Sequence, residues 1–465
     1  MAAQTSPHSC VLAPALKQAL SAGIEGKYGR MFPDLPSCDA DEPALLRLGS
    51  PGSPMDVGVE PDVQGMVSDN PAVPAGYPIL GQFIAHDITA DRSLLQHHAN
   101  IDELRNFRTP RLDLELLYAA GPTGNPYIYD NDDADMFLIG LNDAGKPDDL
   151  PRNQQGRALI GDQRDDVHLI ISQLHLAFLK FHNQVVDYLR KEGVPRADVF
   201  DEAQRLVRWH YQWIVIHEFL PLSVGDALVD DILRNGPRFY SYAERPFIPV
   251  EFADAAYRFG HSQINPTYRL NDTATGRIFP EWAGARPVPH DRVVDWRYFF
   301  PVDGQRPPQP SKRIDTRFVH PMIDLPATVV GETDLPAGHS IAYRDLQRGR
   351  ALDLPSGEAV ARAMGIEPLS KAELGLDALA WRHETPLWYY VLREAEVRTG
   401  GERLGEVGGR IVAEVLLGLI DGDPQTYRSV APDWRPTLPA ARPGSFTMAD
   451  LLVFARVVSN DSPKR

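Results

Sequence analysis

Residues 81–91 read GQFIAHDITAD and place an amide, an imidazole and a carboxylate among apolar side chains. Burying such groups costs free energy unless each finds a hydrogen-bond partner. If the segment is helical, Gln82 and His86 are four positions apart and share one face, whereas Asp87 is rotated by about 100° from His86. The segment therefore predicts two polar sites, one for Gln82 with His86 and one for Asp87. A structural histidine bonded to the aspartate or to the backbone fits the same pattern.

A second polar segment, residues 106–118, reads NFRTPRLDLELLY. Pro110 disfavours a helix through the preceding residue, so we expect an extended segment. In that conformation four polar positions would alternate onto one side: Thr109, Arg111, Asp113 and Glu115. Side-chain and carbonyl oxygens are the ligands that Ca²⁺ prefers, and Asp87 could complete a shell. An exposed polar edge is the alternative.

Two shorter segments carry a cation and a histidine. GDQRDDVHL (161–169) places Arg164 among acids ahead of an apolar run, a pattern that also fits a solvated salt-bridge cluster. AYRFGHSQINPTYRL (256–270) places His261 beside Gly260, and glycine permits the close approach of a flat ligand. A lone buried histidine is more often structural, so each segment is weak on its own.

Helical patterns dominate the elements that must position these residues. Between residues 168 and 192, apolar residues recur at alternating spacings of four and three, which indicates one face of a long helix. Residues 447–458 open with Thr447 and Asp450 at capping-box spacing. We expect a long helix over residues 168–192 and further helices over residues 200–220, 408–420 and 447–458. Alternating strand patterns are scarce, so the sequence predicts a mostly α class.

Composition narrows the class of protein further. The chain has 465 residues and a net charge of −16, which argues against a nucleic-acid or anionic-membrane partner. Its two cysteines form no CxxC pattern, so no thiolate metal site is expected. No stretch approaches the roughly 20 apolar residues of a membrane span, and we expect no signal peptide and a cytoplasmic location. Proline is concentrated in residues 50–80 and 284–340, which we interpret as ordered irregular loops.

The order of the motifs resembles the animal-type haem peroxidase superfamily, the peroxidase–cyclooxygenase group. The matching segments are GQFIAHD, TPRLDLE, GDQRDDVHLIISQLHLAFLKFHN, RFGHSQI, DLQRGRALDLP and LGEVGGRIVAEVL. GKYGRMFPDLP is similar to bacterial members of the group. The resemblance implies a single large helical haem-peroxidase domain over residues 76–460, with long irregular Pro-rich loops and few short strands. Residues 1–75 would form an N-terminal extension that wraps the core.

The resemblance also assigns roles on the distal side of a haem. His86 would be the histidine that moves a proton between the two oxygens of hydrogen peroxide. Arg164 would stabilise the negative charge that develops as the O–O bond breaks. Gln82 would line the same cavity one helical turn away and hold water or a small anion.

On the proximal side, the resemblance makes His261 the axial ligand of the haem iron. Arg258 would pair with a haem propionate. Animal members use an Asn to accept from the second nitrogen of this histidine, and counting three residues on from Pro355 places Glu358 there.

The resemblance implies one metal site besides the haem iron, and it shows three departures from the mammalian pattern. A calcium ion would be held by Asp87, Thr109, the Arg111 carbonyl, Asp113 and Glu115. Mammalian members bind haem through ester bonds, but the two ester positions here are Ala85 and Val167. His168 stands where one member has a bonding Met. We therefore expect non-covalent haem b.

The implied function is peroxide-dependent oxidation of small organic or halide substrates through a high-valent iron-oxo intermediate, with a small-molecule reductant or an apolar substrate as partner. Two alternatives stay open. The first is a fatty-acid dioxygenase, although Arg258 stands where that branch carries a radical-forming tyrosine and Tyr257 lies one position further back. The second is a calcium-stabilised helical binding protein that lost the cofactor. The sequence does not indicate the oligomeric state.

Overall fold

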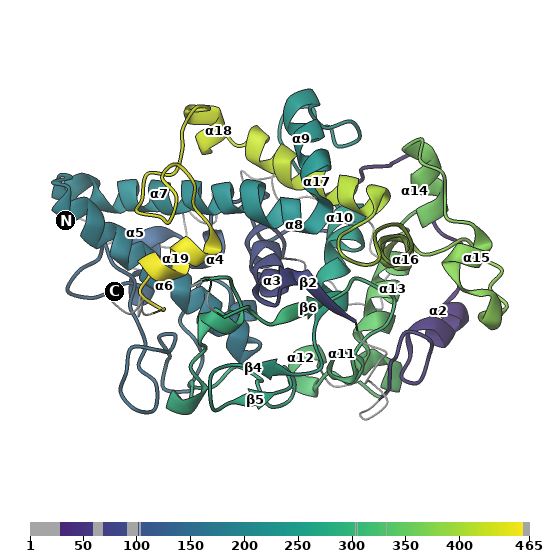
Figure 1. The fold of residues 1–465 in the computed structure, drawn as a ribbon, viewed down its shortest axis with the longest axis horizontal. Helices are drawn as coiled ribbons and strands as arrows, with labels where there is room; N and C mark the ends of the chain where they lie inside the picture. Colours follow the sequence, from purple (N-terminus) through teal and green to yellow (C-terminus); the bar gives the residue numbers. More distant parts are fainter. Residues whose placement is uncertain are drawn as a thin grey trace, which may run out of the picture.

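The structure is a computed structural model that describes residues 28–58, 68–90, 101, 104–302, 304, 306–331 and 333–458. Within these ranges the chain is mostly helical, and its strands form three two-stranded sheets (Figure 1). The predicted class, mostly α with few short strands, is confirmed.

The α-helices are α2 (Glu42–Gly49), α3 (Gly76–Ile88), α4 (Glu115–Tyr118), α5 (Gly121–Gly124), α6 (Leu169–Lys191), α7 (Val199–Ile214), α8 (Leu220–Val224), α9 (Asp226–Asn235), α10 (Val250–Ala253), α11 (His320–Ile323), α12 (Ala327–Val330), α13 (Ile341–Ala351), α14 (Gly357–Ala363), α15 (Lys371–Leu374), α16 (Leu387–Thr399), α17 (Glu406–Gly422), α18 (Tyr427–Val430) and α19 (Met448–Phe454). Two 3₁₀ helices bear on the site, η2 (Gln163–Asp166) and η5 (Ala256–Gln263).

The strands are short, and two of the three pairs join segments that are distant in sequence. β1 (Tyr28–Gly29) pairs in parallel with β3 (Ile248–Pro249). β2 (Asp69–Pro74) pairs antiparallel with β6 (Pro310–Lys312), and β4 (Tyr268–Arg269) with β5 (Thr275–Gly276). β1 pairs with β3, and α2 packs against α13. The first described residues therefore contact later parts of the chain. The domain boundary at residue 75 stays a prediction.

α6, the longest helix in the described residues, lies side by side with α7 (Figure 1). His168 caps the start of α6 by accepting the backbone N–H of Ile171, and the apolar stripe predicted along this helix is buried from Leu174 to Val185. The helix predicted over residues 200–220 is divided: α7 passes through a π-helical turn, η4 (Val215–Phe219), into α8. Such wider turns inside helices are often found at functional sites.

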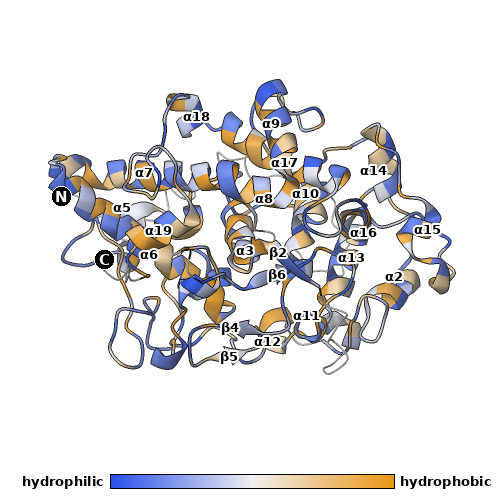
Figure 2. Cartoon of the chain, viewed as in Figure 1, coloured by the Kyte–Doolittle hydropathy of each residue, from blue (hydrophilic) through white to orange (hydrophobic). Residues whose placement is uncertain are grey.

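The helix predictions near the C-terminus are confirmed. α17 is buried from Val407 to Ile420, and the capping box of Thr447 and Asp450 starts α19. Hydrophobic residues concentrate on α3, α8 and α17 near the centre of the view in Figure 2. Of the helices in the described residues, none combines the length and the apolar character needed to cross a membrane.

α3 is the central element of the core, and α6 holds it in place. Phe83 on α3 stacks on Phe178 of α6, with ring centroids 4.4 Å apart, and both rings are fully buried. Because α3 carries Gln82 and His86, this packing fixes the helix that presents them.

Candidate active site

A cavity of about 750 Å³ lies between α3, η2 and η5. It is lined by five residues that the sequence singles out for one haem site: Gln82, His86, Arg164, Arg258 and His261. Segments separated by more than 170 residues therefore meet at a single cavity, as the resemblance predicts.

His86 enters the cavity with one ring nitrogen engaged. Its Nδ1 lies 2.6 Å from Oδ1 of Asp165, which is fully buried. Its Nε2 has no hydrogen-bond partner among the residues that the structure describes. Burial and the charge of Arg164 lower the pKa of His86, although Asp165 opposes the shift. His86 is therefore neutral at neutral pH and has a nitrogen available to accept a proton.

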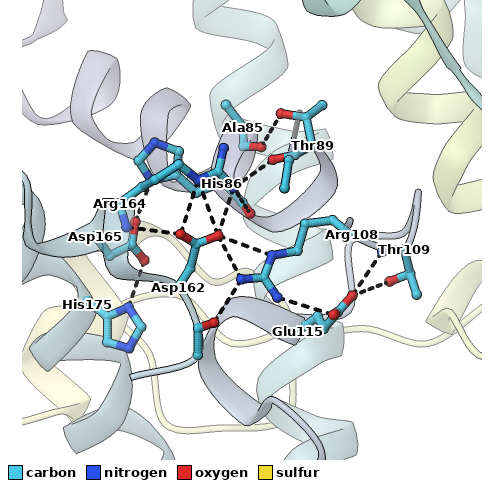
Figure 3. Close-up of polar contacts among 12 residues, drawn as sticks. Ala85, His86, Thr89, Arg108, Thr109, Glu115, Asp162, Arg164, Asp165 and His175 are labelled. Carbon is cyan, nitrogen blue, oxygen red and sulfur yellow. Dashed lines mark hydrogen bonds and ion pairs between the residues drawn. The ribbon is translucent and has the colours of Figure 1, made fainter. Parts of the chain in front are cut away.

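Arg164 is held at the C-terminal end of α3 (Figure 3). Its Nη2 donates to the carbonyls of His86 and Thr89, at 3.0 and 2.6 Å, and pairs with Asp162 at 2.7 Å. Burial opposes ionisation of Asp162, but Arg164 and Arg108 hold the pKa of its carboxyl well below the usual range. Nη1 of Arg164 has no partner in the described part of the chain, so its N–H groups are available to a ligand in the cavity.

Gln82 is oriented by a histidine whose role the sequence did not indicate. Nδ1 of His168 accepts the backbone N–H of Ile171 at 3.2 Å, so the ring carries its hydrogen on Nε2. That Nε2 lies 2.9 Å from Oε1 of Gln82 and donates to it. Burial, together with the nearby His86, lowers the pKa of His168 to about 3, so the ring stays neutral. The amide oxygen of Gln82 is thus occupied, and its NH₂ group remains available as a donor.

On the opposite wall, His261 contacts a different carboxylate. Its Nδ1 lies 2.6 Å from Oδ2 of Asp345, which is fully buried on α13. The other oxygen of Asp345 accepts from Nη1 of Arg258 at 2.8 Å, and Nη2 of Arg258 pairs with Asp254 at 2.8 Å. Burial would raise the pKa of Asp345, but His261 and Arg258 hold it below its usual value.

The prediction that Glu358 is the partner of His261 is wrong. The Glu358 carboxylate accepts from the backbone N–H and the hydroxyl of Thr385. The chain ends α13 at Ala351 and begins α14 at Gly357, so counting on from Pro355 leads into a new helix. Asp345, in the segment DLQRGRALDLP, carries the carboxylate that contacts His261.

The segment with the predicted calcium ligands is bent rather than extended. Leu114 adopts the left-handed region with φ of 59°, and α4 begins at Glu115. Asp87 is fully buried: its Oδ2 accepts the backbone N–H of Leu114 at 3.1 Å, whereas its Oδ1 has no hydrogen-bond partner in the described residues. Arg111 donates its backbone N–H to the Thr109 carbonyl at 2.8 Å. The turn, not a strand, brings the polar positions together.

The donors suit a calcium ion in part. Burial and the charge of Asp113 raise the pKa of Asp87 well above its ordinary value, and burial raises that of Asp113 to about 6. A bound cation would lower the pKa of both carboxyl groups again. The Thr109 hydroxyl lies 3.3 Å from Oδ2 of Asp113. Glu115 is instead bonded to Arg108 and Thr109 (Figure 3). As they stand, no three His, Cys, Asp or Glu side chains in the described ranges are arranged to bind a metal ion.

The cavity also suits a haem. His86 and His261 each have Nδ1 bound to a carboxylate, and among the described residues neither Nε2 has a hydrogen-bond partner. A Cβ added at Gly260 would meet no atom within 4 Å, so the backbone beside His261 opens into free space. Ala85 and Val167 line the cavity and offer no carboxylate for an ester bond.

Comparison with known proteins identifies the family. The model of the animal haem peroxidase family matches residues 96–373, more than half of the chain, and the chain belongs to this family. The family description implies a haem cofactor. The matched stretch contains Arg164, His261 and Asp345, whereas Gln82 and His86 lie before it.

Relatives and solved structures agree with this placement. The chain is 23% identical over 306 residues to a chorion peroxidase of Aedes aegypti (63% of this chain, 37% of the relative) and 27% identical over 289 residues to mouse myeloperoxidase (57% and 39%). It thus spans about two fifths of the length of these relatives. Peroxidase A of Dictyostelium discoideum superimposes with a TM-score of 0.61 at 15% identity (87% of this chain, 88% of that one). A fatty acid alpha-dioxygenase of Oryza sativa gives 0.58 at 14% (90% and 85%). These structures show the fold.

Proposed function

We propose that this protein is a haem-dependent peroxidase that reduces hydrogen peroxide to water and takes two electrons from small organic or halide substrates. The observation that carries the proposal is the pair of histidines, His86 and His261, which face one cavity and are each fixed through Nδ1 by a buried carboxylate. Such a pair, with a guanidinium beside the first, is what peroxide cleavage on a haem requires.

The proximal residues would hold and orient the cofactor. His261 would bind the iron through Nε2, and Asp345 would fix the ring and increase the basicity of that nitrogen. Three donor atoms of Arg258 are engaged by Asp345, Asp254 and the Ala253 carbonyl, so its pairing with a propionate stays a prediction. Haem, when bound, supplies the oxidising equivalents.

The distal residues would carry the proton. Neutral His86 would take a proton from hydrogen peroxide at Nε2 and return it to the oxygen that leaves as water. The N–H groups of Arg164 and the NH₂ group of Gln82 would stabilise the negative charge on that oxygen. Both groups are already oriented, Arg164 by Asp162 and Gln82 by His168, so little reorganisation accompanies the step.

Two further features of the cofactor sites belong to the proposal. Haem b would be bound without covalent links, because Ala85, Val167 and His168 stand at the linking positions. A calcium ion would be held by Asp87, Thr109, Asp113 and the Arg111 carbonyl, with Glu115 left out because Arg108 neutralises it. Calcium would then fix the end of α3 next to His86.

A dioxygenase is the second candidate, because Tyr257 lines the same cavity as His261. Its hydroxyl donates to the Gly81 carbonyl on α3 at 3.2 Å, so the ring lies between the two walls. One of the solved structures with this fold is a fatty acid alpha-dioxygenase. The peroxidase is favoured because Arg258, not a tyrosine, occupies the position three residues before His261.

One set of measurements tests both candidates. The full chain is produced with added haem, its Soret band is recorded, and peroxide is titrated against phenols and halides. Oxygen uptake is then followed with a polyunsaturated fatty acid in the wild type and in Tyr257→Phe. Peroxide consumption that does not need Tyr257 supports the peroxidase. Oxygen uptake that Tyr257→Phe abolishes would favour the dioxygenase. A protein that stays colourless with added haem would favour the alternative of a calcium-stabilised binding protein without the cofactor.

A further inference from the structure

A buried carboxylate joins His86 to a second histidine behind the distal wall. Asp165 is fully buried on η2, with Oδ1 at 2.6 Å from Nδ1 of His86 and Oδ2 at 2.7 Å from Nδ1 of His175 (Figure 3). Both imidazoles thus use the same ring nitrogen, and each oxygen has one partner.

The partners dictate where the hydrogens lie. Burial opposes ionisation of Asp165, but the hydrogen bonds from His175 and His86 keep the pKa of Asp165 below its usual value, so the carboxylate is anionic. An anionic carboxylate only accepts hydrogen bonds, so Nδ1 must carry a hydrogen in both rings. Because Nδ1 of His86 is hydrogen-bonded to Asp165, the nitrogen left to act as a base is Nε2, on the side of the cavity.

His175 holds the Asp165 carboxylate in place but does not relay a proton. It is fully buried on α6 beside Phe83, and its Nε2 has no hydrogen-bond partner in the described residues. Because nothing next to that nitrogen accepts or supplies a proton, His175 cannot pass one on. Its contribution is to hold Oδ2 of Asp165, which leaves Oδ1 directed at His86.

We propose that Asp165 is a positioning residue for the distal histidine: it fixes His86 in the tautomer with the hydrogen on Nδ1, so that Nε2 is the base that faces the cavity. This inference rests on the proposed function for its chemical consequence. When Nε2 takes the proton of hydrogen peroxide, the imidazolium that forms is stabilised by the carboxylate on its other side, as a buried ion pair with a hydrogen bond already in place.

The test replaces Asp165 by asparagine, which keeps the shape and removes the charge. In either orientation of the new amide, the negative charge behind His86 is lost. When its NH₂ group faces Nδ1 of His86, the amide also favours the opposite tautomer, with a hydrogen on Nε2. Hydrogen cyanide must give up its proton to bind ferric haem, whereas carbon monoxide binds ferrous haem without proton transfer. In Asp165→Asn we expect cyanide association and peroxide consumption to slow by at least about 100-fold, with carbon monoxide association unchanged.

The matched control is Glu251→Gln. Glu251 is another fully buried carboxylate, and it accepts the backbone N–H groups of Met31 and Phe32 at 3.0 Å, away from the cavity lining. The Glu251→Gln variant should bind cyanide and carbon monoxide at the wild-type association rates. Unchanged cyanide association in Asp165→Asn would overturn the inference, and so would an equal slowing of carbon monoxide, because a collapsed pocket affects both ligands.

A second measurement needs no folded variant. Nitrogen-15 NMR of histidine-labelled wild-type chain, in its diamagnetic ferrous carbon monoxide form, reports which nitrogen of His86 carries the hydrogen. Hydrogen on Nδ1 supports the inference, and hydrogen on Nε2 refutes it. If the protein binds no haem, the proposed function fails while the same spectrum of the haem-free chain still decides the tautomer.

Discussion

Each of the two cavity walls carries a histidine held by a buried aspartate, but the second partner of the aspartate differs between the walls. On each wall a histidine donates Nδ1–H to a fully buried aspartate at 2.6 Å, His86 to Asp165 and His261 to Asp345. The second oxygen of Asp345 accepts from the guanidinium of Arg258, whereas the second oxygen of Asp165 accepts from the imidazole of His175. One carboxylate is paired with a permanent cation, and the other with a second imidazole.

This difference separates a ligand from a base. Arg258 is always charged, so the carboxylate that contacts His261 is already paired with a cation, which suits the proposed role of His261 as a ligand. Asp165 has no bonded arginine or lysine among the described residues, and its two partners are imidazoles. In the proposed function, a carboxylate without an arginine partner would stabilise the imidazolium that forms when His86 takes a proton from hydrogen peroxide.

Removal of the two histidines should give the largest effects, and they should differ in kind. His86→Ala should retain the Soret band but slow the reaction with peroxide by about 10²–10⁴-fold, the usual contribution of a general base. His261→Ala should lose the band, because the axial ligand is gone. Absorption spectra and stopped-flow mixing measure both. The same outcome in the two variants would mean that the walls are assigned wrongly.

Neutralising the proximal carboxylate should have an intermediate effect. Asp345→Asn removes the negative charge, and its single amide oxygen can accept from only one of the two donors, His261 or Arg258. We expect haem to be retained, the ferric–ferrous midpoint potential to rise, and peroxide turnover to fall by about 10–100-fold. Redox titration and steady-state assays provide the measurement. Asp165→Asn should leave the potential near that of the wild type, and a similar rise there would remove the contrast between the walls.

Removal of calcium should give the smallest effect and act on the distal wall. Chelation, or Asp87→Asn, should loosen the end of α3, shift the Soret band and slow the peroxide reaction by up to about tenfold, while the band itself persists. Metal analysis before and after chelation gives the stoichiometry. As a control, Asp34→Asn removes an exposed carboxylate outside this turn. A chain that contains no calcium, or that is indifferent to chelation, would contradict the proposed site.

The sequence predicted the parts of the fold that repeat a local rule. The apolar stripe of residues 168–192 and the capping box at Thr447 became α6 and α19, because periodicity and capping act over a few residues. It did not predict the π-helical turn after Ile214 or the bend before Glu115. Both depend on packing against elements that are distant in sequence.

The same distinction holds for the site. From the order of the motifs we predicted that Gln82, His86, Arg164 and His261 face one cavity. The structure contains this cavity, and all four residues line it. The carboxylates that orient the histidines were missed, because Asp165 and Asp345 look like ordinary surface acids of a helical chain until the fold buries them. Glu358 was chosen by counting along the chain, and a helix boundary made that count misleading.

The π-helical turn η4 connects the cavity lining to helix α19. At this turn Phe219 becomes part of the cavity lining, while the neighbouring Glu218 accepts from Tyr77 at the start of α3 and from the backbone of Met448 at the start of α19. The widened turn thus connects the cavity wall to α19, the last helix in the described residues. Substitutions near residue 448 can therefore affect the cavity wall through Glu218, although no residue of α19 lines the cavity.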